Sequence, residues 1–166
     1  MNTKDRVGFT LIEILIVVAI IAILASVVLV GLGPTQEAGR DARRISDLSE
    51  VQNGLELYYN KCGIYPGTGT CAAGDPTGGW LGLGNAVIGA NVGIVSAFPN
   101  DPTASKSYSY WYGANNTTYV IGATLENTSN AVFTGYNPPT PGTLMSGLTG
   151  VHPTDCTSVG NYCTTL

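Results

Sequence analysis

The first pattern along the chain is an apolar run that has no period. From Ile14 to Leu32 every residue except Ser26 is apolar, and Lys4 and Arg6 lie in the short polar segment before it. A helix that is apolar on all sides belongs in a core or in a membrane, and about 20 such residues cross a bilayer. We therefore expect a membrane-spanning helix whose basic leader stays in the cytoplasm and whose remaining chain lies outside.

The apolar run ends at Gly31, Gly33 and Pro34. Glycine lowers helix propensity and proline removes a backbone hydrogen bond, so a kink or local melting is expected there. Beyond it, apolar residues recur at steps of three and four, which predicts one face of an amphipathic helix that ends before Gly63. The positions on this face are Ala38, Ala42, Ile45, Leu48, Val51, Leu55 and Tyr58.

The opposite side of the amphipathic segment carries the dense charged sequence RDARR at residues 40–44. Two interpretations stay open. In the first, these charges form a solvated face on which Arg43 pairs with Asp47 and Asp41 pairs with Arg44. In the second, they contact neighbouring copies of the chain and set their register.

Strand patterns dominate the last part of the chain. Residues 107–113 and 117–126 are rich in Tyr, Thr, Val and Ile around a short turn, which predicts a β-hairpin with alternating core and surface aromatics, and residues 159–164 can add a third strand. In the glycine-rich segment before them, Trp80 and Leu81 are expected to anchor a short piece on the long helix. The predicted fold class is α+β: a long N-terminal helix packed by a small antiparallel sheet with long loops.

Composition narrows the function classes. Charged residues make up 11% of the chain, net charge is −4, and all but two of the 7 basic residues lie at or before Arg44. A basic face for nucleic acid is therefore not expected. The chain has a single histidine, His152, and no G-x-S-x-G sequence, so a hydrolase is not expected either. Three sequons, at Asn115, Asn116 and Asn127, are attributed to chance in a chain rich in Asn and Thr.

The four cysteines form two close pairs in the sequence, Cys62 with Cys71 and Cys156 with Cys163. Neither pair has the C-x-x-C spacing of a zinc or redox site. Two local disulfides in an oxidising compartment are favoured, and free thiols stay as the alternative.

The stretch GFTLIEILIVVAIIAILASVVL, from Gly8, resembles the class III signal and N-terminal helix of type IV pilins and type II secretion pseudopilins. The resemblance implies that a prepilin peptidase cuts between Gly8 and Phe9 and methylates the new N-terminal Phe9. It also implies four parts: a leader (1–8) that is removed, a transmembrane and assembly half of the helix (9–33), an amphipathic half (34–60) and a head (61–166).

Glu13 lies near the start of the apolar run, where a carboxylate needs a partner. One partner is local, because Thr10-x-x-Glu13 has the spacing of a capping box. The other is the amine that cleavage creates at Phe9 of a neighbouring subunit. The residues alone leave both open; the resemblance favours a role for Glu13 in assembly, with which the cap can coexist.

The resemblance implies a non-enzymatic structural subunit of a type IV pilus-like filament, assembled by helix bundling after cleavage. Its implied partners are copies of itself, the prepilin peptidase, membrane lipid before assembly and, indirectly, a platform protein and an assembly ATPase. It is expected to cross the inner membrane once before assembly and then to join an extracellular pilus or a periplasmic filament. The alternatives are a pseudopilin acting as a periplasmic piston in type II secretion and a plain membrane-anchored binding module.

No cofactor is expected. Type II secretion pseudopilins that bind calcium use clustered aspartates in a C-terminal loop, whereas this chain has only Glu126 and Asp155 after Leu125, with Asp101 as one further candidate. Calcium requires several oxygen ligands, so a calcium site is not expected here.

Overall fold

The structure, a computed structural model, describes residues 8–67, 71, 79–89, 98–113, 116–139, 149–151 and 156–165. The chain divides into two compact units, Met1–Glu37 and Ala38–Leu166, and helix α1, Leu11–Cys62, contributes to both. The second unit adds helix α2 (Gly79–Gly89), a short 3-10 helix η2 (Ala131–Phe133) and four strands. These elements confirm the predicted α+β class.

The first unit consists, in its described part, of residues 8–10 and the N-terminal portion of α1. Every described side chain from Leu11 to Val27 is exposed, although nearly all of them are apolar. Within the portions of α1 whose side chains are described, no stretch meets the length and hydropathy required to cross a membrane.

The backbone of α1 stays helical through Gly31, Gly33 and Pro34. Local melting therefore does not occur at these residues in this structure, and the expected kink stays a prediction. The helix ends at Cys62, where Gly63 takes a φ of +73° and its N–H donates to the carbonyl of Tyr59 at 2.7 Å. Glycine is favoured at this position because it adopts the left-handed conformation without steric cost.

In the second unit, α1 buries a face that differs from the predicted one at its N-terminal end. Leu48, Val51, Leu55 and Tyr58 are buried as expected, but Ala38 and Ala42 are exposed and Ile45 is only half-buried. The helical period continues this face N-terminally through Arg44 and Asp41, which lie four and seven residues before Leu48. The charged residues are thus inside, and the apolar pattern placed the face one position too far along.

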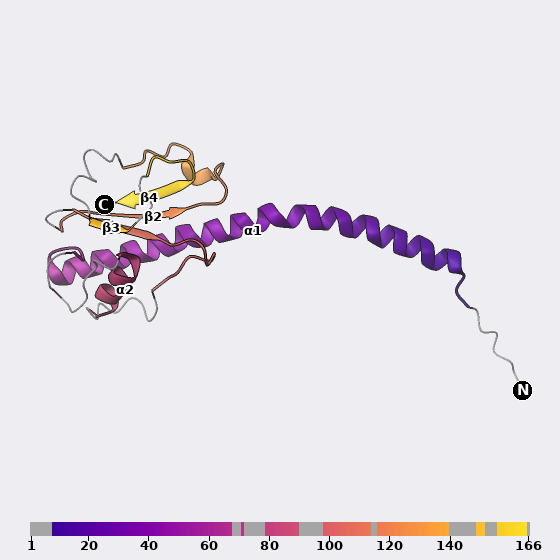
Figure 1. The fold of residues 1–166 in the computed structure, drawn as a ribbon, viewed down its shortest axis with the longest axis horizontal. Helices are drawn as coiled ribbons and strands as arrows, with labels where there is room; N and C mark the ends of the chain where they lie inside the picture. The colour runs from indigo at the N-terminus through magenta and orange to yellow at the C-terminus, as the bar shows by residue number, and fades with distance from the viewer. Residues whose placement is uncertain are drawn as a thin grey trace, which may run out of the picture. The chain divides into compact units, whose positions relative to one another are not determined.

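The head contains a four-stranded antiparallel sheet in the order β3-β1-β2-β4. Its strands are β1 (Ser109–Tyr112), β2 (Tyr119–Thr124), β3 (Thr149–Val151) and β4 (Asn161–Thr165). The predicted hairpin is present as β1 and β2, with Tyr110 opposite Ile121, and the expected third strand is β4. Strand β3 was not predicted. In Figure 1 the labelled strands lie over the C-terminal half of α1, and side chains of this half share a core with side chains of β1 and β2.

The aromatic strand β1 is buried on both faces, so the predicted alternation of core and surface aromatics is wrong. Tyr110 and Tyr112 belong to the main core with α1 and α2, whereas Trp111 lies in a second cluster on the other face of the sheet. That second cluster exists because the Cys156–Cys163 disulfide packs against Trp111 and Val120.

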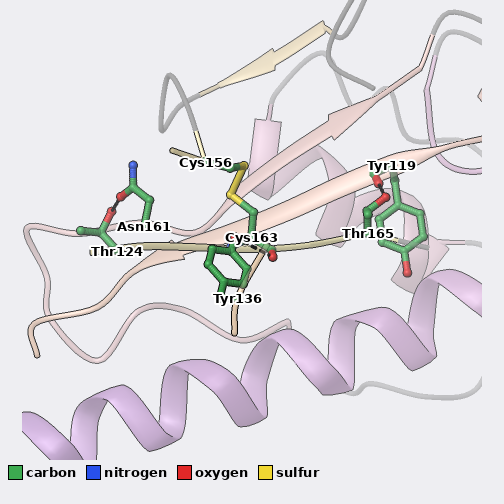
Figure 2. The surroundings of a disulfide bond; sticks show 7 residues. All are labelled: Tyr119, Thr124, Tyr136, Cys156, Asn161, Cys163 and Thr165. Carbon is green, nitrogen blue, oxygen red and sulfur yellow. Dashed lines mark hydrogen bonds between the residues drawn. A yellow bond between two sulfur atoms is a disulfide. The ribbon is translucent and has the colours of Figure 1, made fainter. Parts of the chain in front are cut away.

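Figure 2 shows how this disulfide region is fastened. The hydroxyl of Tyr136 accepts from the backbone N–H of Cys163 at 2.7 Å and donates to its carbonyl at 3.0 Å. Because β4 is an edge strand, its outward-facing N–H and C=O groups have no neighbouring strand to pair with. The Tyr136 side chain provides hydrogen bonds to both of these groups at Cys163. The other disulfide joins Cys62 to Cys71, so the structure contains the two local pairs that the sequence favours.

Helix α2 packs through Trp80, Leu83 and Val87. The indole N–H of Trp80 donates to the carbonyl of Pro99 at 2.8 Å, and its ring lies 5.0 Å from that of Tyr108, between ring centroids. Leu81 is 75% exposed, so its predicted role as an anchor is wrong. The two residues differ because adjacent side chains on a helix point in directions about 100° apart, and here Trp80 faces the core while Leu81 faces away from it.

Candidate assembly site and buried charged cluster

The first candidate site is the start of α1, where Thr10 and Glu13 form a reciprocal capping box. The Oε2 atom of Glu13 accepts from the backbone N–H and from the hydroxyl of Thr10, both at 2.8 Å. In return, the N–H of Glu13 donates to the Thr10 hydroxyl at 3.3 Å. The box satisfies N–H groups that have no partner within the helix, and its carboxylate lies at the positive end of the helix dipole.

The two residues at the expected cleavage point, Gly8 and Phe9, are exposed. Phe9 is 83% exposed, and no heavy atom outside its chain neighbours lies within 4 Å of a Cβ built on Gly8. Both residues are therefore exposed within the part of the chain that the structure describes. Cleavage, methylation of Phe9 and the pairing of its amine with a neighbour's Glu13 stay predictions.

The second candidate site is a buried cluster around Arg44, which is fully buried together with Asp41. The guanidinium of Arg44 makes a two-pronged contact with Asp101, from Nε and Nη2, at 2.8 Å each. It also contacts Asp41 through Nη1, and Glu126 and the Thr103 hydroxyl through Nη2, at 2.8 Å in every case. One arginine thereby meets three carboxylates from three parts of the chain.

Asp41 connects the cluster to the backbone at the end of β2. Its Oδ1 atom accepts from the N–H of Glu126 at 2.9 Å, and its Oδ2 atom accepts from the N–H of Asn127 at 2.8 Å. Arg40 adds a second cation, which pairs with Glu126 through both Nε and Nη2. Charge-assisted and bidentate contacts of this kind are the strongest hydrogen bonds in proteins.

The cluster changes the acidity of its members. Hydrogen bonding from Arg40, opposed by burial and aided by Arg44, lowers the pKa of Glu126 to about 2. Burial by itself would raise the pKa of Asp101, but hydrogen bonds from Arg44 and from the N–H of Thr103 outweigh it and lower that pKa. The hydrogen bond to Asp101 is the main cause of a raised pKa for Arg44. All three groups are thus held in their charged forms.

Neither interpretation of the RDARR sequence anticipated this cluster. Arg43 does pair with Asp47, at 3.7 Å, and is 62% exposed, as a solvated face requires. Asp41 and Arg44 also pair with each other, but they are buried inside one subunit. The available signal was the helical register itself: extending the face from Leu48 backwards in steps of four and three reaches both residues.

Two of the three acidic residues considered for calcium belong to this cluster. Asp101 and Glu126 both contact Arg44, which supplies the positive charge that a cation would bring, and Asp155 lies outside the described residues. Among the residues that the structure describes, no group of three or more His, Cys, Asp or Glu side chains is arranged to hold a metal ion. Of the three sequons, Asn116 is 5% exposed and Asn115 lies outside the described residues, whereas Asn127 is exposed.

The first candidate site coincides with a known family signature. The prokaryotic N-terminal methylation motif matches residues 8–29, which include Phe9, the capping box and the exposed apolar helix. Type II secretion system core protein G of Aeromonas hydrophila is 34% identical over 68 residues, and the protein of the same name from Escherichia coli K12 is 36% identical over 66. The N-terminal part of this chain therefore carries the methylation motif and is similar to these secretion-system proteins, which supports its resemblance to type IV pilins and pseudopilins.

The likeness to these relatives covers part of each chain. For the Aeromonas protein it takes in 41% of this chain and 48% of the relative, and for the Escherichia protein 40% and 46%. Core protein G of Vibrio cholerae is 34% identical over 65 residues, which is 39% of this chain and 44% of that protein. The chain therefore spans less than half the length of the curated relatives it matches. No solved structure is significantly similar to it.

Proposed function

We propose that this chain is a member of the pilin and pseudopilin family and a structural subunit of a helical filament built from packed N-terminal helices. One observation carries the proposal: α1 exposes apolar side chains on all sides from Leu11 to Val27. Such a surface is unfavourable in water and requires lipid or other helices to cover it. A subunit that is first held in a membrane and then bundled with its copies meets both requirements in turn. This role is structural and not enzymatic.

Maturation is proposed to follow the family pattern. The prepilin peptidase cuts between Gly8 and Phe9 and methylates Phe9, and the open conformation of both residues supports its access. Before assembly, the run from Ile14 to Leu32 crosses the inner membrane once. Lys4 and Arg6 keep the leader in the cytoplasm and so place the head on the other side.

Glu13 is proposed to serve assembly in addition to its cap. In a filament the start of α1 leaves lipid headgroups and enters a bundle of helices, where an unpaired carboxylate is costly. The amine of Phe9 on a neighbouring copy supplies the opposite charge. Only Oε2 of Glu13 takes part in the described contacts with Thr10, so the cap and the pair can use different oxygens.

Gly31, Gly33 and Pro34 are proposed as the point at which α1 opens or bends during assembly. They are helical in the isolated subunit, but proline lacks the N–H for an internal hydrogen bond and glycine gains most entropy on unfolding. This short segment lies between the membrane half and the amphipathic half of α1, and we propose that it is the least stable part of the helix.

Of the two filament types, we propose the pseudopilin of a type II secretion system. The sequence analysis placed the surface pilus first, but the curated relatives described above are all named type II secretion system core protein G. The filament would then be periplasmic and would work with a platform protein and an assembly ATPase.

Mass spectrometry of the mature N-terminus in the native host tests the filament proposal. We expect a chain that begins at N-methylated Phe9, and Gly8→Val should abolish this processing. Gly39→Ala is the matched control, because a Cβ at this exposed helical glycine meets nothing within 4 Å. A mature protein that begins at Met1, or that is cut after the apolar run, would contradict the proposal.

Deletion of the gene separates the two filament types. For a pseudopilin, secretion of exoproteins should fail and their periplasmic level should rise, with recovery on complementation. Loss of surface fibres with normal secretion would instead indicate a pilus subunit.

A further inference from the structure

We infer that the Arg44 cluster marks the first point along α1 at which the helix is fixed to the head. The part of α1 before Arg40 can then unwind while the head stays folded. We call the cluster of Arg40, Asp41, Arg44, Asp101, Thr103 and Glu126 the Arg44 clamp. The inference concerns the isolated subunit. It goes beyond the proposed function and does not depend on the type of filament.

Burial along α1 changes abruptly at the clamp. Among the α1 side chains that the structure describes, those before Arg40 are all exposed, and Asp41 is the first that is buried. From Asp41 onward a buried residue recurs every three or four positions to Tyr58. Along the sequence of α1, the first buried side chains therefore make polar, directional contacts with the rest of the second unit. The apolar contacts follow from Leu48 onward.

The clamp joins both ends of the β1–β2 hairpin to a single turn of helix. Asp101 and Thr103 lie in the segment that leads into β1, and Glu126 and Asn127 directly follow β2. Arg44 contacts the first pair, and Asp41 accepts from the backbone of the second. Opening this turn would displace side chains by several ångströms, since one turn rises about 5.4 Å, and would break these contacts together.

The polar contacts of the Arg44 clamp should give a sharp boundary between the part of α1 that unwinds and the part that stays helical. Hydrogen bonds weaken steeply once their geometry is lost, so a partly unwound turn retains little of the clamp. Breaking it also leaves buried carboxylates without a partner, which is strongly destabilising for a buried ion pair. Before Arg40 no described side chain of α1 is buried, so opening there breaks no buried side-chain contact among the described residues.

Hydrogen exchange of the full-length chain in detergent micelles tests the inference, with mass spectrometry of overlapping peptides. We expect the amides of 34–40 to exchange fast and those of 45–58 to exchange slowly. In Arg44→Met, exchange over 42–47 should rise at least about tenfold, while exchange over 51–58 changes less than about threefold. Arg43→Met is the matched control, since Arg43 is the neighbouring arginine and is exposed, and its profile should equal that of the parent chain.

Glu126→Gln gives a second variant if Arg44→Met fails to fold. It removes one carboxylate at the rim of the clamp and leaves the contact between Arg44 and Asp101, so the same 42–47 region should accelerate by a smaller factor. The inference is overturned if the parent chain already protects 34–40 as strongly as 45–58. It is also overturned if either folded variant leaves 42–47 unchanged, or loses protection equally across 42–58.

Discussion

Asp41 accepts the backbone N–H of Asn127 at 2.8 Å, although 86 residues separate the two in the sequence. The carboxylate performs two functions at once, because its other oxygen accepts from the N–H of Glu126 and from Arg44. A helix side chain thus stabilises the backbone at the end of β2, and it does so with a charge that Arg44 balances. The head is therefore fixed on α1 partly by the polar contacts of Asp41, which the apolar pattern of α1 does not predict.

Asp41→Asn tests this double use. Asparagine keeps the size of the side chain but replaces one acceptor oxygen with a donor, so at least one backbone N–H loses its partner and Arg44 loses the negative charge of Asp41. We expect the free energy of unfolding to fall by about 2–4 kcal/mol. Denaturant unfolding followed by near-UV circular dichroism measures it. Glu50→Gln, at an exposed position of the same helix, is the control and should be neutral within about 0.5 kcal/mol.

The acid stability of the head should depend on Glu126. Its pKa is lowered from 4.5 to about 2 in the folded state, chiefly by Arg40. A carboxylate whose pKa is lower in the folded state than in the unfolded state stabilises the folded state fully at pH values above its unfolded pKa. This stabilisation is lost as the pH falls through its folded pKa. Stability should therefore drop between about pH 5 and pH 2, with a slope from this group of up to about 1.4 kcal/mol per pH unit.

Unfolding curves at a series of pH values measure this slope. Glu126→Gln should lower stability at neutral pH and should flatten the acid limb, because the proton uptake is removed. A variant as steep as the parent chain between pH 5 and pH 2 would show that Glu126 is not the titrating group.

The sequence predicted those elements whose side chains follow a simple period. The core positions Leu48 to Tyr58 came from steps of three and four, and the β1–β2 hairpin came from strand-favouring residues on either side of a short turn. Strand β3 was missed because Thr149–Val151 has only three residues and borders turn-rich sequence, so its pairing with β1 depends on tertiary context.

The clamp was missed for a different reason. Hydrophobic periodicity treats charge as a sign of exposure, whereas Arg44 is buried because three carboxylates neutralise it, one on the same helix and two distant in the sequence. Asp101 and Glu126 lie 57 or more residues from Arg44, and nothing local indicates that they meet it. In contrast, the capping box was found at once, because Thr10 and Glu13 interact across a fixed local spacing.

Gly84 in α2 should resist substitution. A Cβ at this position would lie 2.9 Å from Cγ of Phe98, which is closer than real contacts allow. Alanine is ordinarily favoured over glycine in a helix by about 1 kcal/mol, so the sign of the effect shows which factor dominates. Because the contact involves the base of the Phe98 ring, we expect Gly84→Ala to lower the melting temperature. Gly39→Ala, with no atom within 4 Å, should raise it or leave it unchanged.

Tyr136→Phe removes one oxygen from the molecule. That oxygen accepts from the N–H of Cys163 and donates to its carbonyl, on the outer edge of β4 (Figure 2). Solvent can partly replace both bonds, so we expect a loss of about 1–2 kcal/mol in the free energy of unfolding. Tyr59→Phe, at a residue that is 38% exposed on α1, is the control for loss of a phenol group. Equal stability of the two variants would mean that the Tyr136 hydroxyl does not fasten the edge.

The two proposed roles of Glu13 can be separated by two substitutions at its capping box. Glu13→Gln keeps a side chain that is common at this position of a capping box but removes the negative charge, whereas Thr10→Val keeps the charge and removes the hydroxyl that Glu13 contacts. If the carboxylate pairs with the amine of Phe9 on a neighbouring copy, Glu13→Gln should reduce filament yield at least about tenfold. Thr10→Val should then reduce it little.

Filament yield is measured by shearing and sedimentation in a host that expresses the assembly machinery, with membrane-fraction levels of the subunit as the reference. Both variants should be processed at Phe9, since neither changes Gly8 or Phe9. Filament loss only in Thr10→Val would show that the helix cap, and not the charge, is what assembly requires. Normal filaments from Glu13→Gln would contradict the intersubunit pair directly, because the amine of Phe9 would then have no charged partner at this position.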